Sequence, residues 1–266
     1  MSYPFRLGAT SYIIPADIIP NVRYLAGKVS DVELVLFDLP DGPSNLPTPA
    51  QLTELRAIAL DNDLTFTVHL PLDLRMDSSG GPNHPSLEKA RRVIDCTSDL
   101  QPFAYVAHLD GRELSQTGLL RWQEDSIRAL RLVGDWIGDL SKLALENLEG
   151  FALDLHAPVL DAVAVSRTVD VGHLWLDGHD PIAYLRAALP RTRVIHLHGI
   201  SEHDHVSLAH LPVENVSAVL HELLDFNYTG VLTLEMFSEQ DFLSSLAVLQ
   251  QVSGRSATDV SRIAHR

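Results

Sequence analysis

The sequence predicts an α/β protein that folds as a single-domain (β/α)8 TIM barrel. Eight short apolar runs alternate with eight helical runs along 266 residues, and no low-complexity linker divides them. This alternation specifies a parallel sheet, and eight units in about 250 residues are typical of a closed barrel. A doubly wound open sheet is the alternative fold. It would normally carry a Gly-rich phosphate-binding loop after an early strand, and the sequence shows none there.

The predicted strands are rich in Val, Ile, Leu and Thr, which is the composition of parallel strands buried on both faces. In chain order they are Phe5–Tyr12, Val32–Leu39, Leu64–Leu70, Tyr105–Asp110, Lys142–Leu148, Ser166–Asp177, Arg193–His198 and Val231–Phe237. The sixth run begins as a β-branched strand and ends in a Gly turn that carries Asp170 and His173. A strand that ends in a carboxylate and an imidazole is the first indication of a metal site.

The predicted helices follow from amphipathic spacing and from helix-end signals. They are Ile18–Ala26, Pro49–Asp61, Ser86–Leu100, Leu119–Leu140, Asp154–Val165, Ile182–Leu189, Val213–Phe226 and Glu239–Val252. Asp17 is predicted to cap the first helix, and Thr48 with Pro49 to begin the second. Residues 1–252 are therefore assigned to the barrel domain, and residues 253–266 are predicted to form a disordered C-terminal tail.

Two loops between these elements are long and polar. Pro40–Pro49 and Asp73–Pro85 are rich in Pro, Gly, Ser and Asp, and their length suits a lid or the wall of a wide substrate pocket. His84, His198 and His210 lie in loops or at a strand end on the same face of the barrel. We therefore expect these three side chains to contact the substrate.

The composition excludes several classes of protein. The formal charge is −15 at pH 7, whereas nucleic-acid-binding proteins usually present a basic face to the phosphates. No apolar run approaches the roughly 20 residues that span a bilayer, and the N-terminus lacks a secretory pattern. The single Cys96 excludes an intrachain disulfide and Cys-rich zinc motifs. We expect a cytoplasmic protein that binds neither nucleic acid nor membranes, and its oligomeric state is not indicated.

Ionisable side chains stand at the carboxyl ends of six predicted strands. They are His69, His108, Glu146, Asp170, His173, His196, His198 and Glu235, and the loop after the seventh strand adds His203, Asp204 and His205. In a barrel all of these strand ends meet on one face. Burying several unpaired carboxylates there would be expensive unless cations hold them together. The sequence therefore predicts a metal centre.

Each of these residues also has an ordinary structural explanation. A lone His69 or His108 would more often be a hydrogen-bonded core histidine, and Glu146 or Glu235 could belong to a buried ion pair. The nearest cations, however, lie at the opposite ends of their strands. A glycosidase pair formed by Glu146 and Glu235 would leave the imidazoles unexplained.

The ligand chemistry narrows the cofactor. Imidazoles and carboxylates without thiolates suit Zn, Mn or Fe, and the candidates are too numerous for one ion. We therefore expect two or three divalent ions that share a bridging carboxylate, with Glu146 as the bridge because its strand is central in the order. Such a centre clamps phosphoester oxygens and lowers the pKa of a bound water.

The ordered set His69, His108, Glu146, Asp170-Val-Gly-His173, His196 and Glu235 resembles the xylose isomerase-like TIM barrels and, within them, the AP endonuclease family 2 group. The resemblance implies one ion on His69, His108 and Glu146, and a second on Glu146, Asp170, His196 and Glu235. It implies a third ion on His173 and an Asp-x-His pair. This chain departs from that pair, since Asp204 and His205 are adjacent.

Three stretches are similar to the CbiR family of bacterial cobamide-remodelling phosphodiesterases: Phe5–Asp17, Asp31–Phe37 and Thr67–Leu74. This resemblance implies hydrolysis of the nucleotide-loop phosphodiester of cobamides such as cobalamin, to cobinamide phosphate and α-ribazole, for cobamide remodelling and salvage. Glu146 would be the bridging catalytic group, with His173 and His205 assisting proton transfer.

Three other functions stay open on the sequence alone. A sugar or keto-acid isomerase would use a single divalent metal, for which the pair His69 and His108 is superfluous. An AP-endonuclease-like DNA repair hydrolase would be disfavoured by the acidic charge. A corrinoid-binding protein without catalysis is the third.

Overall fold

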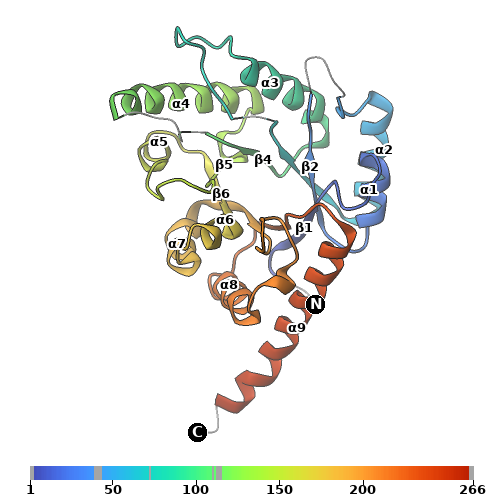
Figure 1. Ribbon diagram of the computed structural model, residues 1–266. Coiled ribbons are helices and arrows are strands. Elements are labelled where there is room, and N and C mark those ends of the chain that lie inside the picture. Colours follow the sequence, from blue (N-terminus) through green and yellow to red (C-terminus); the bar gives the residue numbers. More distant parts are fainter. Residues whose placement is uncertain (1–2, 39–43, 72, 110, 112–115, 264–266) are drawn as a thin grey trace.

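The computed structural model describes residues 3–38, 44–71, 73–109, 111 and 116–263. Eight parallel strands close into a barrel in chain order, so that β1 pairs with both β2 and β8 (Figure 1). The strands are β1 (Arg6–Thr10), β2 (Asp31–Val35), β3 (Thr65–His69), β4 (Ala104–Ala107), β5 (Leu143–Glu146), β6 (Ser166–Asp170), β7 (Thr192–Leu197) and β8 (Val231–Leu234). The prediction of a single-domain (β/α)8 barrel is confirmed.

Helices surround this ring of strands, as Figure 1 shows. They are α1 (Ile18–Leu25), α2 (Pro49–Asn62), α3 (Pro85–Thr97), α4 (Gln116–Ile137), α5 (Ala157–Ala162), α6 (Val171–Leu176), α7 (Pro181–Ala188), α8 (Val213–Asp225) and α9 (Glu239–Ile263). Short 3-10 turns are η1 (Ser98–Leu100), η2 (Leu140–Lys142), η3 (Leu189–Arg191) and η4 (Leu208–His210). No helix among the described residues is both long and apolar enough to cross a membrane.

The starts of α1 and α2 show which capping predictions hold. At α2, the Thr48 hydroxyl accepts from the Gln51 amide at 3.3 Å, and the Gln51 side chain accepts from the Thr48 amide at 2.9 Å. This reciprocal capping box confirms the predicted start. Asp17 occupies the N-cap position of α1 as predicted, but its side chain makes no capping hydrogen bond. Asn21 instead fixes the chain before α1, because its side chain binds the Ile14 amide at 2.9 Å and carbonyl at 3.1 Å.

The chain after β6 differs from the predicted Gly turn. Asp170 ends the strand and caps α6, since its carboxylate accepts from the His173 amide at 2.7 Å. A Cβ atom at Gly172 would lie 2.1 Å from the His198 ring, so glycine is needed for this close approach. His173 therefore stands in the first turn of a helix, which fixes its backbone rigidly beside the strand ends.

The C-terminal helix is longer than the sequence analysis expected. It was predicted to end at Val252 before a disordered tail, whereas α9 continues as helix to Ile263. The Ser253 hydroxyl donates to the Leu249 carbonyl at 2.8 Å and also pairs with the Tyr3 hydroxyl near the other end of the chain. Both contacts involve Ser253, the first residue past the expected boundary, and Figure 1 shows the end of the helix standing away from the barrel.

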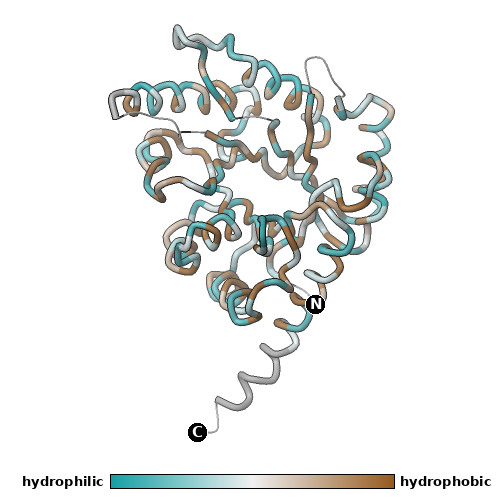
Figure 2. Tube along the Cα trace, viewed as in Figure 1, coloured by the Kyte–Doolittle hydropathy of each residue, from teal (hydrophilic) through white to brown (hydrophobic). Residues whose placement is uncertain are grey.

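The apolar core lies between the strands and the helices. Figure 2 shows hydrophobic strands inside a ring of helices whose hydropathy alternates along each helix. Inside the barrel itself the side chains are different. A small apolar cluster of Ala104, Val106 and Val194 fills one part, because β4 and β7 are not neighbours and meet only across the interior. Much of the remaining interior is polar and buried.

The buried polar residues of the barrel strands are Thr10, Asp31, Glu33, Thr67, Glu146, Thr168, Asp170, His196 and Thr233. Gly8 on β1 makes room for two of them, since a Cβ atom there would lie 3.3 Å from the Thr233 hydroxyl and 3.4 Å from the Asp31 Cβ. A barrel interior with this many ionisable groups is poor at burying apolar surface. It is therefore specialised for holding charge near the strand ends.

The loop Asp73–Pro85, predicted as a lid or substrate loop, is held against α4. Within it, Asp77 Oδ1 accepts from the amides of Ser79 and Gly81, each at 2.9 Å. Arg128 on α4 donates to the Gly80 carbonyl at 2.9 Å. The loop therefore has a fixed shape in this structure. The predicted loop Pro40–Pro49 lies in part outside the described residues.

Asp31 generates a prediction about stability and pH. Burial raises the pKa of this carboxyl from 3.8 to about 7, although hydrogen bonds from Thr65 and Thr67 oppose the shift. As pH rises through that window, the unfolded chain releases the proton before the folded protein does, so stability falls.

We expect Asp31→Asn to raise the free energy of unfolding. This increase should be about 3 kcal/mol larger at pH 8 than at pH 5. Urea unfolding at the two pH values measures this difference. Asp61→Asn, on the exposed side of α2, is the matched control and should show no such pH dependence. An equal effect of Asp31→Asn at both pH values would contradict the assignment.

Candidate metal centre

The strand ends bring the candidate ligands together. His69, Glu146 and Asp170 are the last residues of β3, β5 and β6, and His196 lies in β7. His108 and Glu235 follow β4 and β8 by one residue. Ligand atoms that lie within 4.8 Å of one another form four overlapping groups here, and one of these joins Glu33 on β2 to His69 and Glu235. We call the other three the central group, the histidine-pair group and the α6 group.

The central group consists of Glu146, Asp170, His196 and Glu235, all of them buried. His196 Nδ1 lies 3.1 Å from Glu146 Oε1, 2.9 Å from Glu235 Oε2 and 3.9 Å from Asp170 Oδ2. Three carboxylates from three strands thus converge on one ring nitrogen. This is the donor set of a hard or borderline divalent cation such as Mn, Zn or Fe.

The histidine-pair group joins His69 and His108 to Glu146. Glu146 Oε2 lies 3.0 Å from His108 Nε2 and 3.6 Å from His69 Nε2. The two rings meet edge to face, with centroids 4.7 Å apart. Glu146 therefore presents Oε1 to the central group and Oε2 to this one, which is the arrangement that a bridging carboxylate requires.

The α6 group consists of Asp170, His173, His198 and His205. Asp170 lies 3.2 Å from His198 Nε2 and 3.5 Å from His173 Nδ1, and the rings of His198 and His205 stack at 4.2 Å. His205 Nε2 also lies 3.4 Å from Glu235 Oε2. Asp170 is thus shared with the central group, as Glu146 is shared on the other side.

A cation fits the central group by its donor geometry. Glu235 Oε2 is buried without a hydrogen-bond partner, although His196 Nδ1 is only 2.9 Å away. The two atoms face each other without forming a hydrogen bond, as two ligands of one ion do. A buried carboxylate oxygen left in this state would cost several kcal/mol without a cation.

The electrostatics show the same excess of negative charge. Burial alone would lower the pKa of His196, but the charges of Glu235, Glu33 and Glu146 raise it well above its usual value. At His69 and His205 burial again lowers the pKa and nearby carboxylates raise it, and the carboxylates prevail. The pKa of His69 rises to about 9, mainly through Glu146, and that of His205 to about 10, mainly through Glu235. In the absence of a metal ion, protonated imidazoles supply the positive charge that balances these carboxylates.

The other predicted site residues are placed as follows. His198 was predicted to contact substrate, but it is fully buried and belongs to the α6 group. Asp204 Oδ1 lies 3.0 Å from His205 Nδ1, and its Oδ2 lies 3.9 Å from His173 Nε2, so it borders this group. His203 is exposed and directs its Nδ1 to the Asp204 carbonyl at 2.7 Å.

His84 and His210 lie away from the three groups. His84 caps α3 by accepting from the Ser86 amide at 3.2 Å, and His210 ends the exposed part of η4. Contact of these two side chains with a substrate stays a prediction. Neither residue is brought into the ligand set by the fold.

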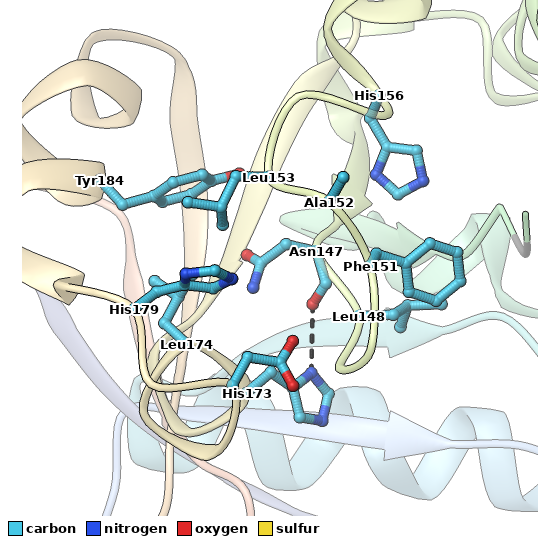
Figure 3. Close-up of a pocket in the computed structure, with 11 residues that line it drawn as sticks. Asn147, Leu148, Phe151, Ala152, Leu153, His156, His173, Leu174, His179 and Tyr184 are labelled. Atoms are coloured by element: carbon cyan, nitrogen blue, oxygen red, sulfur yellow. Dashed lines mark hydrogen bonds between the residues drawn. The ribbon is translucent and has the colours of Figure 1, made fainter. Parts of the chain in front are cut away.

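A small pocket lies beside the α6 group, between the segment after β5 and α6 (Figure 3). His173 forms part of its wall and is held by the Asn147 carbonyl, 3.1 Å from His173 Nδ1. His156 and His179 also line it. His156 is buried, and its Nε2 lies 3.1 Å from the Leu109 carbonyl.

Sequence reasoning missed Glu33 on β2. Its carboxylate is fully buried and lies 2.9 Å from His196 Nε2. The available signal was a Glu within the apolar run Val32–Leu39, where a buried charge needs a partner. The partner lies on β7, 163 residues further along the chain, and only the closed barrel reveals it.

The metal centre generates a prediction about pH. His69 and His205 are charged in the folded, metal-free protein up to a pKa of about 9 and about 10, but near 6.5 when unfolded. Their stabilising contribution is therefore complete below pH 6.5 and is lost as pH rises toward 9 to 10. For His69 alone it is about 3 kcal/mol.

We therefore expect chelator-treated protein to lose several degrees of Tm between pH 7 and pH 9.5, and added Mn²⁺ or Zn²⁺ to restore it. Differential scanning calorimetry measures both effects. His196→Ala should abolish the restoration, whereas His221→Ala, an exposed position on α8, should preserve it. A metal-free protein with constant Tm across this range would argue against the charge assignment.

Comparisons with known proteins agree with this geometry. The family model for the xylose isomerase-like TIM barrel matches residues 29–252. A search of curated proteins by sequence finds no match.

Solved structures with the same fold include a D-tagatose 3-epimerase-like protein, at TM-score 0.77 and 18% identity over 96% of this chain and 100% of that one. The 3-keto-D-glucoside 4-epimerase of E. coli gives TM-score 0.68 and 15% identity, over 94% and 99%. A D-psicose 3-epimerase gives 0.65 and 18%, over 97% and 99%. At these identities the likeness establishes the fold.

These findings correct the predicted function. The sequence analysis expected a phosphodiesterase that hydrolyses cobamides, on a resemblance to the CbiR family. The similar solved structures are instead sugar epimerases and isomerases, so the prediction of a cobamide phosphodiesterase is wrong. The prediction of a cobamide substrate rested on three short stretches, Phe5–Asp17, Asp31–Phe37 and Thr67–Leu74, and not on the ordered ligand set.

Proposed function

Because the chain belongs to the xylose isomerase-like TIM barrel family, we propose that it is a sugar isomerase or epimerase that uses a divalent metal. The central group carries this proposal, since Glu146, Asp170 and Glu235 converge on His196 at the carboxyl end of the barrel. The similar structures named D-tagatose 3-epimerase-like protein, D-psicose 3-epimerase and L-ribulose 3-epimerase support it. The substrate class we propose is a small keto-sugar.

A divalent ion at the central group would polarise the carbonyl of a keto-sugar and acidify the neighbouring C–H bond. The residues of the chain then have to move one proton. Glu146 and Glu235 project from β5 and β8, which are not neighbours in the barrel, and so approach the site from different directions. One carboxylate removes the proton, and the other returns it to the opposite face of the carbon for epimerisation.

Both carboxylates suit the role of base. Burial would raise the pKa of Glu146 and of Glu235, but the positive charge of His196 lowers both well below the usual range. Each group is therefore ionised at neutral pH, which is the state that a general base requires. His173 and His205 lie beside Asp170 and Glu235, where they could exchange protons with substrate hydroxyls.

We propose two or three divalent ions in total, of Zn, Mn or Fe. The histidine-pair group and the α6 group support this number, because each shares a carboxylate with the central group. One ion at the central group is sufficient for the sugar chemistry. The single Cys96 supports a reducing, cytoplasmic location.

The proposal is tested by incubating metal-loaded protein in D₂O with D-tagatose, D-psicose, D-fructose and L-ribulose. We expect deuterium at the carbon next to the carbonyl and formation of the epimer or isomer, read by NMR and chromatography. Glu146→Gln and Glu235→Gln should each lower kcat about 10²- to 10⁴-fold, the usual contribution of an acid–base group.

Glu202→Gln, an exposed position in the loop after β7, is the matched control and should retain kcat. Absence of deuterium exchange with every sugar, in protein shown to contain metal, would rule out the proposed function. Exchange that persists in Glu146→Gln and Glu235→Gln would keep the activity but remove these residues from the proton transfer.

A further inference from the structure

Glu33 is a buried carboxylate that the proposed chemistry does not use. It lies on β2 between Val32 and Leu34, and its side chain crosses the barrel interior to reach His196 on β7. Glu33 Oε2 lies 2.9 Å from His196 Nε2, and both side chains are fully buried. The Thr233 hydroxyl adds a longer contact to the same oxygen at 3.5 Å.

A carboxylate in this position is expensive to bury, because removing it from water costs several kcal/mol unless a partner compensates. Its ion-pair partner among the described residues is an imidazole. An aliphatic side chain of similar volume would fill this position without the free-energy cost of removing a charge from water. The placement therefore has to be explained by what Glu33 does to His196.

The two ring nitrogens of His196 face opposite environments. Nδ1 faces the carboxylates of Glu146 and Glu235 at 3.1 and 2.9 Å, whereas Nε2 faces Glu33. A nitrogen that binds a metal must present its lone pair, so the other nitrogen has to carry the proton. A carboxylate that accepts this N–H fixes the tautomer and ring orientation and makes the ligating nitrogen more basic.

The other candidate ligands have different partners on this side of the ring. His205 Nδ1 also meets a carboxylate, Asp204 Oδ1 at 3.0 Å, but the Asp204 side chain is 32% exposed. His69 Nδ1 faces the Leu70 carbonyl at 3.0 Å, and His173 Nδ1 faces the Asn147 carbonyl at 3.1 Å. A backbone carbonyl is neutral and holds the ring more weakly than a carboxylate does. His196 is thus the ligand candidate whose outer nitrogen meets a dedicated, fully buried carboxylate.

We propose that Glu33 is a positioning residue that holds His196 as the tautomer whose Nδ1 binds the metal of the central group. The inference rests on the metal centre of the proposed function but not on the identity of the sugar. It assigns the buried carboxylate on β2 to the affinity and geometry of the metal site. Glu33 itself contacts neither substrate nor metal in this assignment.

The first experiment measures metal binding without any sugar. Glu33→Gln keeps the side-chain shape and removes the charge, and it should weaken Co²⁺ binding about 10- to 100-fold, with an altered Co²⁺ absorption spectrum. Glu33→Asp keeps the charge but shortens the reach, so its affinity should be intermediate. The number of ions bound at saturation should not change in either variant.

Asp31→Asn, measured at pH 8 where the Asp31 carboxyl is ionised, is the matched control, because Asp31 is an equally buried carboxylate two residues earlier on β2. Its oxygen accepts from the Thr65 hydroxyl at 2.5 Å and is not bonded to His196. This variant should change Co²⁺ affinity less than about threefold and leave the spectrum unchanged. An equal loss in Asp31→Asn and Glu33→Gln would show a general charge effect and overturn the proposal.

The second experiment keeps the proposal testable even where Glu33→Gln fails to fold. Long-range ¹⁵N–¹H NMR of Zn²⁺-loaded wild-type protein shows which His196 nitrogen carries the proton. We expect the proton on Nε2. A proton on Nδ1, or loss of one bound ion in Glu33→Gln, would overturn the proposal, the latter because Glu33 would then be a ligand.

The outcomes separate this inference from the proposed function. Weakened metal binding in Glu33→Gln, together with no turnover of any keto-sugar, would support the role of Glu33 and remove the proposed activity. Turnover of a keto-sugar with unchanged Co²⁺ affinity in Glu33→Gln would support the proposed activity and remove the role of Glu33.

Discussion

The carboxylate of Glu146 is the interaction on which the candidate site depends. One of its oxygens faces His196 and the other faces His108, so that two groups of ligands meet on a single side chain. Asp170 plays a similar part toward the α6 group. Buried carboxylates in this number cannot all remain ionised without positive charge between them. Either protonated imidazoles or divalent ions must supply it, and the donor geometry favours ions.

The barrel meets this constraint by giving up part of its apolar interior. Glu33, Asp31 and several threonines occupy positions that branched aliphatic residues usually fill in such barrels. The main apolar core is displaced to the layer between strands and helices, which supplies the stability. Polar side chains inside the barrel can then support the ligands from below, as Glu33 supports His196.

The same arrangement explains why the substrate could not be deduced from ligand order. Histidines and carboxylates at the strand ends are dictated by the metal, and a metal can serve phosphoester hydrolysis or proton transfer beside a carbonyl equally well. What separates the two reactions is the shape of the loops above the strand ends and the identity of the proton-transfer groups. Short peptide similarities in β1, β2 and β3 carry neither kind of information.

Sequence and tertiary structure contributed different parts of this account. The alternation of apolar and amphipathic runs predicted the barrel, because strand and helix periodicities are local properties of the chain. Strand ends that converge on one face then identified His69, His108, Glu146, Asp170, His196 and Glu235 as neighbours.

The sequence missed what depends on distances between remote elements. The place of His198 in the α6 group and the bond from Glu33 to His196 both join residues that are far apart in the chain. Local periodicity determines which elements form and in what order. Only closure of the barrel decides which buried groups face each other across its interior, because those pairs are set by three-dimensional distance and leave no spacing in the chain.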